Sequence, residues 1–102
     1  MPAVARADGV DTVSVHECGV IPNCDTGSDN VKVNGNSIHR EEDKNTSHPF
    51  APPPAGCPEH QTKITKGSPN VYANGKQVAR LGDSYGCGIK VTSGSGNVFC
   101  NG

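Results

Sequence analysis

The sequence has little of the material that fills a conventional hydrophobic core. Its 102 residues contain no tryptophan, four other aromatic residues and one leucine, and only 32% are hydrophobic. The shortage of leucine argues against helices that pack on one another. The 13 glycines and eight prolines favour turns and short strands instead. The sequence therefore predicts one small all-β domain over residues 1–102, which needs support beyond apolar burial.

Charge and targeting signals are also sparse. Nine basic residues oppose ten acidic ones, which gives a net charge of −1. The charges form neither a basic stripe for nucleic acid nor a cationic face for an anionic membrane. The N-terminal MPAVARADGVD lacks the apolar run of a signal peptide, and no stretch is long enough for a membrane-spanning helix. We expect no nucleic-acid partner and no export by the general secretory route.

The sequence does contain one motif that recurs three times, called the repeated phrase below. Gly-Ser-x-Asn-Val-x-x-Asn-Gly appears within segments 26–43, 66–83 and 93–102. Asn-Gly is the two-residue turn signal of a β-hairpin, because both residues tolerate a left-handed backbone. Segment 2–11 resembles the second half of the unit, so the two chain ends together would complete a third copy. Three units in so short a chain predict pseudo-threefold packing around an axis, tapering toward one end.

Cysteine and histidine are frequent for a chain of this length, with five and four copies. Without a signal peptide, metal ligation is favoured over disulfides. In each unit the arginine-containing half leads to a metal-competent residue, and convergence of the units would bring three of them together: His16, His48 and Cys87. His60 ends the Pro-rich insertion at 48–60, which we expect to form neither helix nor interior strand. Three histidines and one cysteine suit tetrahedral zinc and leave no open position, so the predicted site is structural.

Taken together, these motifs resemble the PAAR-repeat family. The resemblance rests on PAVAR at 2–6, NGKQVARLGD at 74–83, the repeated phrase and the His/Cys set. It implies a small cone of short β-strands and hairpins with pseudo-threefold repeats. It also implies a zinc ion near the apex, held by His16, His48, His60 and Cys87. Iron is the alternative metal, because imidazole suits it too.

The resemblance also implies a function. Proteins of this family cap the trimeric β-helical spike of type VI secretion systems and contractile phage tails. The chain is therefore expected to be a non-enzymatic structural tip, bound as one copy to a VgrG-like or phage tail spike trimer, that transiently meets and pierces a target membrane. Its expected location is a phage tail tip, or the bacterial cytoplasm followed by secretion through the injection machine.

Two other functions remain open. One is a stand-alone small zinc-binding adaptor module. The other is a thiol-dependent enzyme that uses Cys57 with His60. The surrounding APPPAGCPEHQ carries no signature of a cysteine hydrolase, which disfavours the enzyme.

The middle copy, NSIHREED at 36–43, departs most from the repeat. It makes His39 a competitor of His48 as a ligand, although His39 aligns with Ala79, which favours a structural or exposed role. The charged segment 39–45 is interpreted as a solvated turn.

The remaining cysteines divide into two groups. Cys100 aligns with small apolar residues of the other copies and is predicted to be a core residue. Cys18, Cys24 and Cys57 are either packed thiols or partners in a disulfide or a second metal site.

Overall fold

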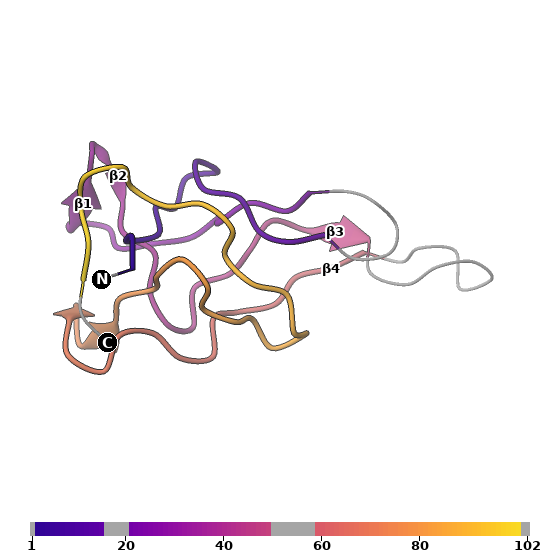
Figure 1. The fold of residues 1–102 in the computed structure, drawn as a ribbon. Helices are drawn as coiled ribbons and strands as arrows, with labels where there is room; N and C mark the ends of the chain where they lie inside the picture. Colours follow the sequence, from indigo (N-terminus) through magenta and orange to yellow (C-terminus); the bar gives the residue numbers. More distant parts are fainter. Residues whose placement is uncertain (1, 16–20, 50–58, 101–102) are drawn as a thin grey trace.

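The protein is described here by a computed structural model that covers residues 2–15, 21–49 and 59–100. Within these ranges the chain forms no helix, and so none that could cross a membrane. Its strands have two residues each and pair antiparallel in three separate sheets (Figure 1). They are β1 (Lys32–Val33) with β2 (Asn36–Ser37), β3 (His48–Pro49) with β4 (Glu59–His60), and β5 (Tyr72–Ala73) with β6 (Lys76–Gln77). The predicted all-β class is confirmed.

The Asn-Gly turns form where the repeat predicts them. Asn34 and Gly35 connect β1 to β2 with φ angles of 53° and 82°, and Asn74 and Gly75 connect β5 to β6 with 56° and 78°. Two consecutive residues with positive φ make a type I′ turn, whose twist matches that of the flanking strands. Two of the three units are thus ordinary two-residue hairpins at one end of the molecule (Figure 1).

The third unit is completed by the two ends of the chain. Ala3 pairs antiparallel with Phe99. The Val4 N–H donates to the Val98 carbonyl at 3.0 Å, and the Cys100 N–H donates to the Pro2 carbonyl at 3.1 Å. The N- and C-terminal segments therefore pair like the two strands of one hairpin, as the sequence predicts.

A closed circuit of backbone hydrogen bonds marks the pseudo-threefold axis. The Ala5 N–H donates to Ala79 (3.0 Å), the Ala79 N–H donates to His39 (2.9 Å), and the His39 N–H donates to Ala5 (3.1 Å). All three residues are completely buried. Their neighbours pair in the same cyclic order: Val4 with Arg80, Arg40 with Val78, and Arg6 with Ile38. A single chain thus reproduces the symmetry of a trimer.

Each copy contains a glycine followed by a serine because its backbone packs closely against the neighbouring unit. Ser28, Ser68 and Ser95 are buried, and their backbone N–H groups donate to carbonyls of the circuit's flanking residues at 2.9 to 3.0 Å. Each serine hydroxyl in turn accepts hydrogen bonds from two backbone N–H groups of its own turn. A Cβ on Gly67 would lie 2.4 Å from the Val78 carbonyl oxygen, so no larger residue fits.

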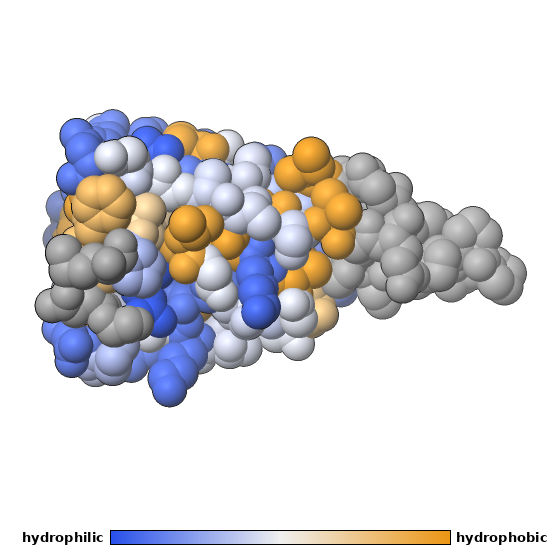
Figure 2. All heavy atoms as spheres, viewed as in Figure 1, coloured by the Kyte–Doolittle hydropathy of each residue, from blue (hydrophilic) through white to orange (hydrophobic). Residues whose placement is uncertain are grey.

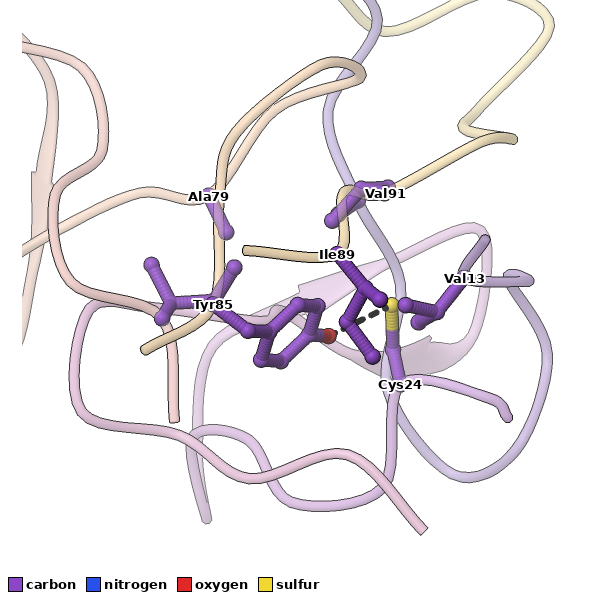
Figure 3. Packing of buried hydrophobic residues seen from close by; sticks show 8 residues of the cluster. Val13, Cys24, Ala79, Tyr85, Ile89 and Val91 are labelled. Atoms are coloured by element: carbon purple, nitrogen blue, oxygen red, sulfur yellow. Dashed lines mark hydrogen bonds between the residues drawn. The ribbon is translucent and has the colours of Figure 1, made fainter. Parts of the chain in front are cut away.

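Beyond the circuit, six chain segments close into a second ring. Their pairings run Thr12 with Asn23, Cys24 with Asn45, Lys44 with Lys63, Ile64 with Tyr85, Ser84 with Lys90, and Val91 with Val13. A closed ring leaves no unpaired strand edge at this level. It surrounds the larger core cluster, in which the Tyr85 ring lies among aliphatic side chains and the Cys24 thiol (Figure 3).

The ends of the insertion at 48–60 pair as strands, with His48 opposite His60, and continue the pairing of Lys44 with Lys63. They form a two-stranded sheet, so neither is an interior strand, which agrees with the prediction. Residues 50–58 of the insertion lie outside the described ranges. The charged segment 39–45, by contrast, is not a solvated turn throughout, so that expectation is wrong in detail.

Within that segment, Asp43 and Asn45 are buried, while Glu42 and Lys44 are exposed. Asp43 is buried because it accepts hydrogen bonds from the backbone N–H and the guanidinium of Arg40. Equivalent pairs form in the other two units, Arg6 with Asp11 and Arg80 with Asp83. At Asp11, burial by itself would raise the pKa, but the hydrogen bonds from Arg6 outweigh it and hold that pKa below its ordinary value.

The close approach at Gly67 can be tested by adding a single methyl group. Gly67→Ala should lower the free energy of unfolding by about 2 to 3 kcal/mol, because the Cβ collides with the backbone at Val78. Gly96→Ala, in the third copy, is the matched control, since no atom lies within 4 Å of its Cβ. It should change stability by no more than about 0.5 kcal/mol. Urea denaturation measures both, and equal effects would contradict the packing described.

Candidate metal centre

Three potential metal ligands meet at the end of the molecule opposite the Asn-Gly hairpins. His48 lies in β3 and His60 in β4, which Figure 1 places at that end. Cys87 lies in the tight turn of the next unit, where the Gly88 N–H donates to the Tyr85 carbonyl at 2.9 Å. The ligand atoms of His48, His60 and Cys87 all lie within 4.8 Å of one another.

The two histidines face each other through the same ring nitrogen. Their Nε2 atoms are 2.8 Å apart, and the rings meet edge to face at 75°. His48 is completely buried, and its Nδ1 donates to the Thr46 carbonyl at 2.8 Å. That bond leaves the Nε2 lone pair of His48 directed into the cluster. Two imidazole nitrogens on one tetrahedral zinc lie about 3.3 Å apart, so this pair is within half an ångström of what a shared ion requires.

The donor set fits a metal such as zinc. Cys87 is partly buried, and its Sγ adds a soft ligand to the two imidazoles. The cluster links two neighbouring hairpins at the end opposite the Asn-Gly turns, so a bound ion would act as a cross-link there. His16, the fourth predicted ligand, lies outside the described residues, as do Cys18 and Cys57.

His39 takes no part in this cluster. It is completely buried on the pseudo-threefold axis, where its Nδ1 donates to the Thr26 carbonyl at 2.6 Å. Its Nε2 then accepts from the Tyr85 hydroxyl at 2.7 Å. Burial lowers the pKa of His39, because the charged imidazolium is poorly solvated there. The structural role suggested by its alignment with Ala79 is confirmed, and His48 is the residue that joins the cluster.

The two other described cysteines are packed thiols. Cys24 is completely buried, and its Sγ lies 3.4 Å from the Tyr85 oxygen (Figure 3). Burial raises the pKa of Cys24 to about 12, so the thiol is unreactive at neutral pH. Cys24 and Cys100 form no disulfide. Cys100 packs with Val33 and Ala73 in the second core cluster, which confirms its predicted role.

Sequence reasoning missed the polar residues that support the site. Thr62 contacts Cys87, Asn45 donates to Thr62, and Tyr85 holds the buried His39 nearby in the core. The repeat offered a signal for two of them. Two residues beyond the aspartate of each unit stand Val13, Asn45 and Tyr85, and all three point inward and are buried.

The fold and the cluster define a class: a small all-β protein with three internal repeats and a His/Cys group at one end. The sequence matches the family model of the PAAR motif over residues 13–93. The chain therefore belongs to the PAAR-motif family. No curated protein sequence matches it.

The buried histidine predicts a pH dependence of stability. The pKa of His39 is lower in the folded than in the unfolded chain, so the unfolded chain binds the extra proton first. The stability due to neutral His39 is present above about pH 6.5 and is lost as the pH falls below it, by at most about 1.4 kcal/mol per pH unit.

His39→Gln is the matched variant, because its amide can donate to Thr26 and accept from Tyr85 without titrating. Urea denaturation of both proteins in the presence of chelator, at pH 7.5 and pH 5, should give a steeper loss for the wild type. Parallel losses would contradict the assigned burial of an uncharged imidazole.

Cys87 and Cys100 provide a matched pair of cysteine substitutions. Cys87→Ser should abolish metal binding and lower the free energy of unfolding by several kcal/mol, because a cross-linking ligand is lost. Cys100→Ser should keep the metal and lose only about 1 kcal/mol. Chelator should reproduce the first effect in the wild type.

The measurements are thermal melting and metal content by X-ray fluorescence. Similar losses of melting temperature in both variants would count against a metal at Cys87. So would a disulfide from Cys87 to Cys18 or Cys57.

Proposed function

We propose that this protein is the tip of a contractile injection machine. In this role one chain caps a trimeric β-helical spike, of the VgrG-like or phage tail type, and presents a narrow, metal-stapled end to a target membrane. Membership of the PAAR-motif family is consistent with a spike-tip role. The protein would then reside at a phage tail tip, or in the bacterial cytoplasm until the machine secretes it.

The observation that carries the proposal is the cyclic symmetry of a single chain. The circuit through Ala5, His39 and Ala79 relates three units by an approximate threefold axis. A monomer with this symmetry can offer similar surfaces to three identical subunits, which an asymmetric monomer cannot. One copy can then contact all three subunits at the end of a trimer.

The end that carries the Asn-Gly hairpins is the proposed base. Equivalent positions of its three units hold Lys32, Tyr72 and Phe99, and all three side chains are exposed. Exposed aromatic residues are typical of contact surfaces. On the face shown in Figure 2, hydrophilic side chains predominate around this end, as expected of a surface that docks rather than forms a permanent core.

Zinc is the proposed metal, and its proposed role is mechanical. Two imidazoles and a thiolate, with His16 as the fourth ligand, would complete a closed tetrahedral site with no position for a substrate. Such an ion ties chain segments together where few apolar residues are available, and keeps the narrow end rigid when axial force is applied. X-ray fluorescence should therefore give the zinc line rather than that of iron.

Stoichiometry tests the proposal directly. Mixed with a trimeric spike fragment, the protein should form a complex of one chain per three spike chains, measured by native mass spectrometry. A spike fragment truncated at its blunt end is the control and should not bind. Three chains per trimer, or no binding to any spike fragment, would overturn the cap and favour the isolated zinc-binding adaptor.

A further inference from the structure

Thr62 lies beside the cysteine of the metal centre. Its hydroxyl oxygen is 3.1 Å from Cys87 Sγ, within hydrogen-bonding distance for sulfur. Thr62 follows β4 closely in the chain, whereas Cys87 lies in the turn of the next unit. The contact therefore joins the two hairpins that supply the ligands.

Asn45 sets the direction of this hydrogen bond. It is completely buried, and its Oδ1 accepts from the Thr62 backbone N–H at 3.0 Å. Its Nδ2 consequently faces the Thr62 hydroxyl oxygen and donates to it at 2.8 Å. Because that oxygen accepts the amide proton, and because a thiolate can only accept, the hydroxyl proton is free to point at the sulfur of Cys87.

We propose that Thr62 is a positioning residue of the metal centre, whose hydroxyl, oriented by Asn45, donates a hydrogen bond to the Cys87 thiolate. The inference rests on the metal site of the proposed function. The bond fixes the side-chain orientation of Cys87 and occupies a lone pair of the sulfur that does not face the metal.

The histidine side of the site is supported in the same way. His48 Nδ1 donates to the Thr46 carbonyl, while the Thr46 hydroxyl accepts from the Asn23 N–H at 2.9 Å. Residues 45 and 46 thus support a ligand on each side, Asn45 through Thr62 and Thr46 directly. Partners of this kind change metal affinity by about 10- to 100-fold when removed.

The test is Thr62→Val, which keeps the shape of the side chain and removes the hydroxyl. Titration with Co²⁺ against a competing chelator should show affinity about 10- to 100-fold weaker, with unchanged stoichiometry. The thiolate-to-cobalt charge-transfer band should move to longer wavelength, because a sulfur without its hydrogen bond gives up electrons more easily. A merely structural role for Thr62 would not move that band.

Two control variants separate the hydroxyl from general effects. Thr62→Ser keeps the hydroxyl and should retain wild-type affinity within about threefold and the wild-type band. Thr65→Val removes a comparable hydroxyl, which donates to the Ser84 carbonyl at 3.2 Å rather than to a ligand of the cluster. It should leave metal binding unchanged. If Thr62→Val is not folded by circular dichroism, Thr62→Ala carries the same test.

The outcomes distinguish this inference from the function on which it rests. If the wild type binds Co²⁺ and the hydroxyl-free variant binds it equally well with an unshifted band, only the role of Thr62 is overturned. The same holds if Thr62→Ser is as weak as Thr62→Val. If the wild type binds neither Co²⁺ nor Zn²⁺, the metal centre itself is overturned.

Discussion

Three backbone N–H groups and three carbonyl groups, contributed by Ala5, His39 and Ala79, satisfy one another in a circuit at the centre of the molecule. These groups are completely buried, and an unpaired one would cost free energy. The three units must therefore keep both their spacing and their cyclic order. The glycine and serine of each copy follow from that constraint, because the backbone of each unit runs directly against the flanking residues of the circuit.

The replacement of alanine by histidine at one of the three positions has consequences in the next layer. Imidazole is larger than a methyl group and has two nitrogen atoms that need partners. Thr26 satisfies one and Tyr85 the other, and Tyr85 in turn fills the centre of the second ring. The threefold symmetry is thus broken at His39 in the circuit and again in the second ring, where the large Tyr85 aligns with the small Val13.

Because its apolar core is small, the protein depends for its stability on closed hydrogen-bonded rings and on polar interactions. The described strands have two residues each, too few to be stable in isolation. Ring closure, partly buried arginine–aspartate pairs and a His/Cys group at the end opposite the Asn-Gly hairpins compensate for the missing core. There the His/Cys group joins two hairpins, so a metal ligated from both would cross-link them.

Much of this architecture could be predicted from the sequence, because a repeat is visible without any structure. The Asn-Gly turns, the completion of the third unit by the chain ends and the inward position of Cys100 all follow from aligning the copies. Repeat position also selected His48 and Cys87 as converging residues. His60 was found because it closes the insertion at 48–60.

Other features were decided only by the tertiary structure. The number of units, their turns and the residue types available as ligands follow from the sequence alone, because these depend on local backbone preference and on repetition. The sequence could not determine that Asp43 and Asn45 are buried, that His39 bonds to Tyr85, or that Thr62 meets Cys87. The last two contacts join residues from different units. Whether a polar side chain faces solvent or a partner depends on the segment packed against it, and that is fixed only when the units close around their common axis.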